Sequence, residues 1–316
     1  MENKMKKMLT IFAMLLISAS CVAQQKVTME QKGNSVQVKI DGKLFTEYVH
    51  GEQKPYLYPV IGPNGINMTR NYPMKDNVKE EKKDHPWHSS VYYTHGDVNG
   101  IDFWNDKSSD QKEAKIVLDK IEKVDNPTPD SGRIIATHNW VFKGKTQMSD
   151  RTEIVFSGDN DKRIIDYSVT LTASNGDVKL GDTKEGCMAV RMHYKLRVND
   201  MGAKVINSEG VTGKNVWGKK AKWISYYNDI EGKVAGISMM DHPENLRYPT
   251  PWHARDYGLC AANAFGLKYF TKDKKNIGDL TIKNGESLTF KYRLIFHNGS
   301  PTDAKVEDLH KNWISK

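Results

Sequence analysis

Apolar and polar side chains alternate along much of the chain, which is the pattern of strands with one buried face. The alternation is clearest in residues 163–173, 187–198 and 286–297. The positions expected to point into a core are Ile165, Tyr167, Val169, Leu171, Ala173, Met188, Val190, Met192, Tyr194, Leu196, Val198, Leu288, Phe290, Tyr292, Leu294 and Phe296. The pattern therefore predicts antiparallel strands in all three segments.

Glycine-containing turns separate the predicted strands. Asp41-Gly42 interrupts the alternating segment 35–49 and predicts a hairpin, because Asp-Gly favours the tight turns that join antiparallel strands. Lys32-Gly33-Asn34 predicts another turn just before it. These turns are typical of a chain built mostly from hairpins.

One segment, at the C-terminus, reads as a helix. Val306, Leu309 and Trp313 recur there at helical spacing, and Thr302 or Asp303 can cap the helix that they predict. The fold class that follows is all-β: a large antiparallel β-sandwich with a C-terminal helix. No linker rich in Pro, Gly or Ser divides the chain, so we expect one domain.

The N-terminus has the pattern of a secretory signal. Three lysines precede an apolar run at residues 8–17, and small residues follow it. We expect residues 1–23 to be a signal peptide and residues 24–316 to form the single domain of a secreted, periplasmic protein. The alternative is cleavage before Cys21, with a lipid anchor on that cysteine. No later stretch approaches the ~20 apolar residues of a transmembrane helix, so we expect no transmembrane segment.

The charge of the chain predicts solubility and a mild preference for anionic partners. The 316 residues are 38% hydrophobic and 27% charged, with a formal net charge of +8. The positive charge is spread along the chain, so no nucleic-acid partner is expected. The two cysteines after the signal, Cys187 and Cys260, are expected to be buried free thiols, and a disulfide between them is the alternative.

Histidines gather in two loop-like regions, residues 84–104 and 241–257. The first begins with DHPWH, and the second contains DHP at residues 241–243 and PWH at residues 251–253. The spacing and the flanking residues differ, which argues against a duplication. Loops that carry His, Asp, Arg and Trp together are where functional sites usually lie. We therefore expect the two regions to meet at one pocket.

Proton transfer is the chemistry that these histidines suit best, because imidazole titrates near neutrality. We expect His88 and His253 to be an acid and base pair. Glu185 precedes a predicted strand with a basic face and is expected to be the supporting catalytic carboxylate, and Glu153 is a second carboxylate candidate. A divalent metal at His85 and His88, with Asp97 or Asp102, is the alternative, and no other cofactor is expected.

A sugar fits the aromatic and polar composition of these loops. Its C–H faces pack on aromatic rings, and its hydroxyl groups take polar side chains. The partner is therefore expected to be a small molecule or oligosaccharide. The residues expected to bind it are His85, Trp87, Asp97, Asn99, Arg191, His242, Arg247, Trp252, Arg255 and Asp256.

Several motifs resemble a known family. GDVNGIDFW, GDTKEG, INSEG, VWGKKAKWISY, DHPENLRYPTPWHARDYGLCAANAFG and LTFKYRLIFHNG are similar to the PmoA-like, or methane-oxygenase-like, family of uncharacterised secreted bacterial proteins. The label does not describe the chemistry, because a membrane methane oxygenase subunit needs several transmembrane helices. The resemblance implies a sandwich of the sugar-mutarotase kind and a role in carbohydrate catabolism.

The first loop of that family usually reads DHPHHRG. Here His85 and His88 match, whereas Trp87 replaces the middle His and Ser89 replaces the Arg. The function expected is that of an enzyme acting on a glycoside or an oxidised sugar: a lyase, hydrolase or epimerase. The alternatives are a noncatalytic glycan-binding protein and a metal-dependent oxygenase.

Overall fold

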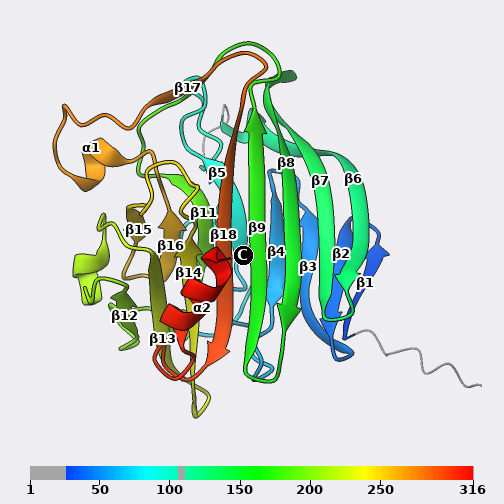
Figure 1. The fold of residues 1–316 in the computed structure, drawn as a ribbon, viewed down its shortest axis with the longest axis vertical. Helices are drawn as coiled ribbons and strands as arrows, with labels where there is room; N and C mark the ends of the chain where they lie inside the picture. Colours follow the sequence, from blue (N-terminus) through cyan, green and yellow to red (C-terminus); the bar gives the residue numbers. More distant parts are fainter. Residues whose placement is uncertain (1–25, 106–110, 316) are drawn as a thin grey trace, which may run out of the picture.

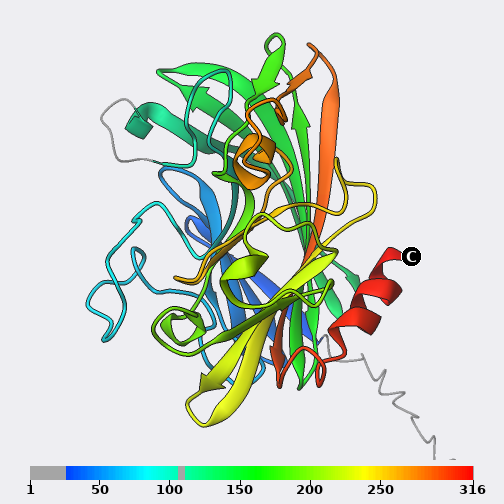
Figure 2. The same ribbon diagram turned by 90° about the vertical axis from the view of Figure 1, so that its left-hand side faces the viewer.

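The computed structural model describes residues 26–105 and 111–315. Two eight-stranded antiparallel sheets pack face to face, with a small two-stranded sheet at one end (Figures 1 and 2). The predicted signal peptide and Cys21 lie outside the described residues. In the part of the chain that is described, no helix is both long and apolar enough to cross a membrane.

The first sheet has the order β1-β2-β3-β4-β5-β11-β16-β15. Its strands are β1 (Val27–Lys32), β2 (Ser35–Ile40), β3 (Lys43–His50), β4 (Pro55–Val60), β5 (Val91–His95), β11 (Gly186–Arg191), β16 (Leu259–Ala262) and β15 (Trp252–Ala254).

The second sheet has the order β12-β13-β14-β18-β9-β8-β7-β6. Its strands are β12 (Lys204–Asn207), β13 (Trp223–Ile230), β14 (Lys233–Asp241), β18 (Ser287–Asn298), β9 (Lys162–Thr172), β8 (Lys145–Gly158), β7 (Ser131–Phe142) and β6 (Ala114–Thr128). The small sheet pairs β10 (Val178–Leu180) with β17 (Leu280–Ile282), and the α-helices are α1 (Leu267–Phe270) and α2 (Val306–Ile314).

The main core lies between the two large sheets. Phe45 of β3 meets Phe156 of β8 and Phe296 of β18, with ring centroids 6.1 and 6.4 Å apart. The alternating residues of β9 and the central part of β18 point into this core, as predicted from their period of two. The predicted all-β sandwich with a C-terminal helix is therefore confirmed.

Local signals were right about turns and less exact about where elements end. Asp41 and Gly42 join β2 to β3 with φ of 51° and 73°, the left-handed backbone that the Asp-Gly pair allows. The strand expected over 187–198 stops at Arg191, because the backbone N–H groups of Met192 and His193 donate to Gly258 and Met68 outside a ladder. A short 3-10 helix follows.

The C-terminal helix begins later than predicted. The residue before it is Lys305, in the left-handed conformation, and no side chain caps the helix. Asp303 instead accepts hydrogen bonds from the backbone and hydroxyl of Ser300. The apolar stripe is as expected: Leu309 and Trp313 pack with Val306 on the outer face of the second sheet (Figure 2).

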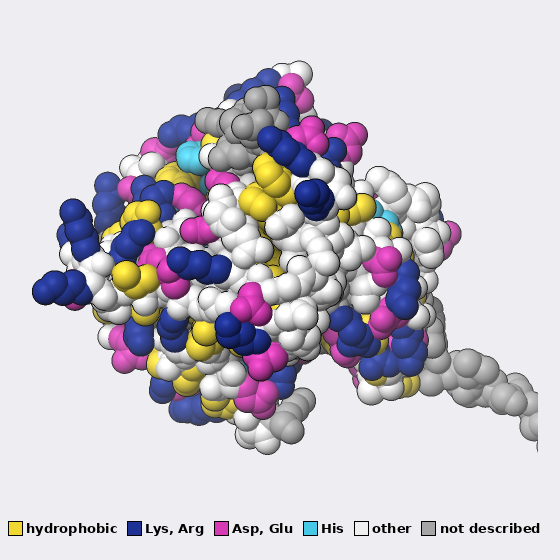
Figure 3. Space-filling view, turned by 90° about the horizontal axis from the view of Figure 1, so that it is seen from above, with side chains coloured by type: hydrophobic (Ala, Val, Ile, Leu, Met, Phe, Trp, Pro, Cys, Tyr) yellow, Lys and Arg dark blue, Asp and Glu magenta, His cyan; other side chains and the backbone are white. Residues whose placement is uncertain are grey.

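Cys187 and Cys260, the two cysteines among the described residues, are free and buried. On the face seen in Figure 3, Lys and Arg side chains are interspersed with Asp and Glu.

A buried polar network ties the two sheets together. The Tyr48 hydroxyl on β3 lies 2.6 Å from Nε2 of His138 on β7, and Nδ1 of His138 lies 2.8 Å from Asp150 on β8. The same carboxylate accepts hydrogen bonds from Trp140 Nε1 and the Thr152 hydroxyl. With His138 donating to Asp150, Tyr48 donates to His138, so every member has a partner.

Tyr48→Phe should lower the free energy of unfolding by about 1–3 kcal/mol, because it leaves Nε2 of His138 buried without a partner. Urea denaturation measures this change. Tyr227→Phe is the matched control, since Tyr227 is half-buried on β13 and its hydroxyl has no hydrogen bond within the described chain. Equal stability of the two variants would contradict the cross-sheet role of the network.

Candidate functional site

A cavity of about 300 Å³ opens on the outer face of the first sheet. It is formed by the loop before β5, the loop after β5, the residues that lead into β11 and the hairpin of β15 and β16. The residues that line it are His85, Trp87, His88, Trp104, Asn105, Lys184, Glu185, His253, Arg255 and Tyr257. The two histidine-rich regions thus meet at one pocket.

Strand register explains why the pocket lies here. His253 pairs with Ala261, Ala261 pairs with Ala189, and Ala189 pairs with Tyr92, so these four residues share one row across the sheet. Because side chains of neighbours in a row point to the same face, His253 and Tyr92 face outward together. The two alanines between them are small and leave space. Of this row, His253 lines the cavity.

Trp252 is one residue earlier and points the other way. It is fully buried in the main core, and its Nε1 donates to the backbone oxygen of Ala221. The prediction that Trp252 forms a wall of the pocket is therefore corrected by the alternation of β15. Trp87 does line the pocket, where it packs with Tyr92 and Trp104 in a second apolar cluster.

Two buried arginines hold the DHPWH loop against the sheet. Nη1 of Arg70 and Nη2 of Arg191 each donate to Oδ1 of Asp84, at 2.7 and 2.8 Å. Arg70 also donates to the backbone oxygens of Asp84 and His85. Arg191, predicted to contact substrate, is 2% exposed and acts on the pocket through its neighbours. The loop is thereby fixed by charge-assisted hydrogen bonds.

The three charged residues that hold the DHPWH loop, Arg70, Arg191 and Asp84, carry more positive than negative charge. Burial first, and then the nearby charge of Arg191, lower the pKa of Arg70 to about 10 against the pull of Asp84. Burial would raise the pKa of Asp84, but the hydrogen bond to His85 and the charges of Arg191 and Arg70 hold it well below its usual range. One ionised carboxylate thus faces two guanidinium groups behind the pocket wall.

His88 is a neutral hydrogen-bond donor in this setting. Nη1 of Arg191 lies 3.2 Å from Nδ1 of His88. A guanidinium only donates, so Nδ1 must accept, and the neutral ring then carries its proton on Nε2. Burial first, and then the charge of Arg191, hold the pKa of His88 well below its usual value. A ring with this tautomer can donate to a substrate oxygen but cannot serve as a general base at Nε2.

His253 has the same arrangement with a different donor. Nε1 of Trp217 donates to Nδ1 of His253 over 3.2 Å, which leaves the proton on Nε2. Burial, followed by the charges of Arg255, Lys184 and His85, lowers the pKa of His253 to about 3. Both Nδ1 atoms are thus occupied by N–H groups, which favours two neutral donors over the expected acid and base pair.

The ring of His85, a residue of the first loop, lies between a ring of its own loop and a ring of the second. Its ring stacks on His88 and on Tyr257, with centroids 4.9 and 5.1 Å apart and planes 8° from parallel in both pairs. Its Nδ1 lies 3.0 Å from Oδ2 of Asp84, and its side chain is 35% exposed. His85 is thus the histidine of this pocket most open to solvent.

Glu185 is the carboxylate among the residues that line the pocket. Its backbone oxygen accepts from Gly96 N at 2.8 Å, and a Cβ on Gly96 would lie 2.9 Å from Cβ of Glu185. The glycine therefore permits the close approach that sets Glu185 at the edge of β5. Oε1 of Glu185 contacts Nζ of Lys184, and the side chain is 27% exposed. Within the described chain, Oε2 has no hydrogen-bond partner.

Two buried donors near His88 are also without a partner among the described residues. They are the Tyr92 hydroxyl and Nε1 of Trp104. The rings of both residues contact His88, at centroid distances of 6.3 and 5.6 Å.

Sequence reasoning missed four of the lining residues as site residues: Trp104, Asn105, Lys184 and Tyr257. Lys184 is adjacent to Glu185 and Tyr257 is adjacent to Asp256, so proximity to predicted residues was the available signal. Asp102 accepts from the backbone of Trp104 and Asn105, a local turn that places both at the pocket.

The structure places other predicted residues away from this pocket. Asp97 and Asn99 stabilise turns, where they accept hydrogen bonds from Gly100 N and Lys179 N. Arg247 donates to the backbone oxygens of Ala264 and Gly278. These expectations are corrected for a common reason: the polar side chains satisfy backbone groups of loops that have no strand partner.

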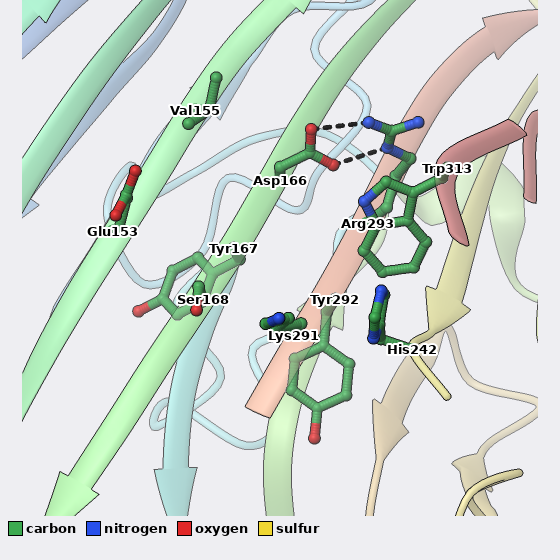
Figure 4. A pocket seen from close by; sticks show the side chains of 10 residues that line it. All are labelled: Glu153, Val155, Asp166, Tyr167, Ser168, His242, Lys291, Tyr292, Arg293 and Trp313. Carbon is green, nitrogen blue, oxygen red and sulfur yellow. Dashed lines mark hydrogen bonds and ion pairs between the residues drawn. The ribbon is translucent and has the colours of Figure 1, made fainter. Parts of the chain in front are cut away.

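His242 also lies elsewhere. It borders a groove on the outer face of the second sheet, where its ring meets Trp313 edge-on at 5.0 Å (Figure 4). Arg293 in that groove is held by both oxygens of Asp166. Glu153 lines the same groove, whereas Glu185 lines the histidine pocket. The DHP of residues 241–243 is thus separate from the DHP of the first loop.

Asp256 borders a smaller adjoining cavity of about 190 Å³, next to Lys214 at 3.2 Å. Arg255 lines both this cavity and the main pocket. Among the described residues, no group of three or more His, Cys, Asp and Glu side chains is placed to hold a metal ion. The Arg191 guanidinium occupies the Nδ1 side of His88, at 3.2 Å.

Comparison with known proteins gives a family and a loose structural likeness. A family model described as a family of unknown function (DUF6807) matches residues 35–311. No curated protein matches the chain. The family match does not bear on the resemblance to PmoA-like proteins.

Solved structures with some likeness include a galactose mutarotase-like protein from Clostridium acetobutylicum, 11% identical with a TM-score of 0.37 over 86% of this chain and 98% of that one. A putative aldose 1-epimerase from Escherichia coli K12 is 9% identical, with a TM-score of 0.36 over 86% and 98%. A glycoside hydrolase family 97 enzyme from Pseudoalteromonas sp. strain K8, in complex with panose, is 9% identical with a TM-score of 0.37. The match covers 86% of this chain and 34% of that enzyme. Overlaps this weak do not bear on function.

The depressed pKa of His253 predicts a stability loss in acid. Its pKa is about 3 in the folded chain and 6.5 for a histidine free of such surroundings, so between these values the unfolded chain binds a proton that the folded chain does not. Stability is therefore lost as the pH falls below about 6.5. At pH 4.5 this one group should cost roughly 2–3 kcal/mol.

His253→Asn removes the titration and keeps an oxygen to accept from Trp217. Urea denaturation at pH 7.5 and pH 4.5 should show a smaller acid-induced loss in this variant than in the wild type. The same loss in both proteins would show that His253 is not held neutral.

Proposed function

The chain belongs to the family of unknown function DUF6807, and we propose that it is a carbohydrate-active enzyme that removes a proton next to a carbonyl or carboxyl group of a sugar. Export to the periplasm, directed by residues 1–23, stays a prediction, with lipid attachment at Cys21 as the alternative. The proposal rests on the composition and geometry of the histidine pocket.

One observation carries the proposal: two neutral imidazoles and one carboxylate line the same pocket. Nδ1 of His88 and Nδ1 of His253 are both occupied by N–H donors, so each ring offers Nε2–H to a ligand. Preorganised donors of this kind stabilise negative charge that develops on an oxygen atom. Neutral imidazole is suited to the task because its proton is shared with the oxygen and not lost.

Glu185 is the base of the proposed reaction. Its Oε2 is free of hydrogen bonds within the described chain, and the side chain opens to the pocket. A carboxylate can remove a proton from a carbon atom when the resulting enolate oxygen is held by donors, which His88 and His253 supply. Epimerisation and β-elimination both begin with this step.

Glycoside hydrolysis fits the pocket less well. That reaction usually needs two carboxyl groups on either side of the scissile bond. Among the described residues that line the pocket, Glu185 is the one carboxylate. The rings of Trp87 and Tyr257 provide apolar surface for the sugar face.

The test begins with binding. Methyl glycosides, aldonic and uronic acids and keto sugars derived from glucose, galactose and mannose are screened by thermal shift, since a ligand raises the melting temperature by mass action. Each sugar that binds is then incubated with the protein in D₂O, and proton NMR follows exchange at carbon and product formation. We expect exchange next to the carbonyl or carboxyl carbon.

Glu185→Gln should lower the exchange rate by about 100-fold or more, the usual contribution of a general base. Sugar affinity measured by calorimetry should change little, because the amide keeps the shape of the carboxyl group. Glu153→Gln is the matched control, with a half-buried carboxylate in the outer groove of the second sheet, and it should leave the rate unchanged. Binding without exchange or turnover in the wild type would instead identify a noncatalytic glycan-binding protein.

A further inference from the structure

Arg255 differs from the other arginines of the chain. Eight of the nine arginines donate to an oxygen or to an imidazole within the described residues: Arg70, Arg133, Arg151, Arg163, Arg191, Arg197, Arg247 and Arg293. The guanidinium of Arg255 has no hydrogen bond and no carboxylate partner among those residues. It lies instead over the Tyr257 ring, 5.3 Å from the centroid. Arginine presents five N–H donors, so a half-buried one without an acceptor is available to a ligand.

The backbone holds Arg255 firmly at the pocket. Its N–H donates to Leu259 O at 2.7 Å, and its own oxygen accepts from the Tyr226 hydroxyl at 3.2 Å. Its side chain lines both the main pocket and the smaller cavity beside it. Asp256, the neighbouring carboxylate, is paired with Lys214. The backbone that carries the free guanidinium is thus fixed, at the boundary of two cavities.

The charges around the pocket leave Arg255 uncompensated. Lys184 and Glu185, which also line the pocket, pair with each other. Behind the wall, Arg70 and Arg191 share the single carboxylate of Asp84. A ligand that brings one negative charge would therefore meet an excess of positive charge. It would also give Arg255 the acceptor that the protein does not supply.

We infer that the sugar bound in this pocket is a uronic acid or a glycoside of one, with its carboxylate held by Arg255. The inference rests on the proposed function and names its substrate class. Guanidinium and carboxylate match as planar groups and form two parallel hydrogen bonds. A carboxylate also makes the neighbouring C–H acidic, so one group serves both recognition and reaction.

The reaction balances without an oxidant or a second substrate. Glu185 takes the proton from C5, and the electrons of that C–H bond form a C5–C6 double bond, which leaves an enediolate that His88 and His253 stabilise. If water delivers a proton to C5 from the opposite face and Glu185 releases its own proton to solvent, the product is the C5 epimer. If the electrons instead form a C4–C5 double bond, the C4–O bond breaks and the leaving oxygen takes a proton from water.

Calorimetry in the Glu185→Gln background, where turnover is blocked, tests the inference. The probes are methyl glucuronide and methyl galacturonide, the matching neutral methyl glucoside and galactoside, and glucose 6-sulfate. We expect the uronides to bind about tenfold or more tighter than the neutral sugars, as for a hydrogen bond between charged groups. Adding Arg255→Met should abolish this preference, whereas Arg151→Met, an exposed arginine on the second sheet, should retain it.

Equal affinity for uronides and neutral sugars would overturn the inference, as would a preference that survives Arg255→Met. Tighter binding of the 6-sulfate than of the uronides would also overturn it, because it would assign the site to another anion. If Arg255→Met does not fold, Arg255→Lys replaces it. Lysine keeps the charge but not the planar fork, so the preference should fall but not vanish, and an unchanged preference would count against the inference.

Failure of the inference and failure of the proposed function are distinguishable. Exchange or turnover of a neutral keto sugar that depends on Glu185 would leave the proposed function standing without the uronate. An Arg255-dependent preference for uronides, with no exchange in the wild type, would support the substrate class and refute the catalytic role.

Discussion

The site depends on one interaction: the carboxylate of Asp84 is shared by two buried arginines, Arg70 and Arg191. These arginines are 3% and 2% exposed, and the carboxylate lies beside His85. Buried guanidinium groups without an acceptor would destabilise the fold. The loop that carries Asp84 is therefore held next to these two arginines. The same loop carries His85, Trp87 and His88 into the pocket. Loop position and charge balance are therefore set together.

Arg191 links that support to the chemistry of the pocket. One nitrogen of its guanidinium holds Asp84 and the other donates to His88, which fixes the tautomer of the imidazole. Nε1 of Trp217 donates to Nδ1 of His253 and fixes the same tautomer in that ring. The histidines are thus polar donors held in one orientation, and Glu185 is left as the group that can accept a proton. A pocket with this division of roles suits the formation of an enolate.

The sequence predicted the fold and part of the site. Alternation and Asp-Gly turns were sufficient for the sandwich, because these signals depend on neighbouring residues. His85, Trp87, His88, Glu185, His253 and Arg255 were also predicted and share one pocket. The failures have a different origin. Trp252 and His253 are neighbours with the same surrounding sequence, and only their place in the strand decides that Trp252 points into the core and His253 into the pocket. Tautomers depend on Arg191 and Trp217, which are distant in the chain, so the sequence could not show that the Nδ1 atoms of both histidines are occupied.

The chemistry of the pocket depends on the protonation state of His88 and His253, which ¹⁵N NMR of the imidazole rings measures. Protein labelled at the histidine ring nitrogens, with His88→Gln and His253→Asn variants for assignment, is measured between pH 7.5 and pH 5. We expect both rings to be neutral and protonated on Nε2 throughout this range. A ring protonated on Nδ1, or an imidazolium ion that forms near pH 6.5, would contradict this expectation.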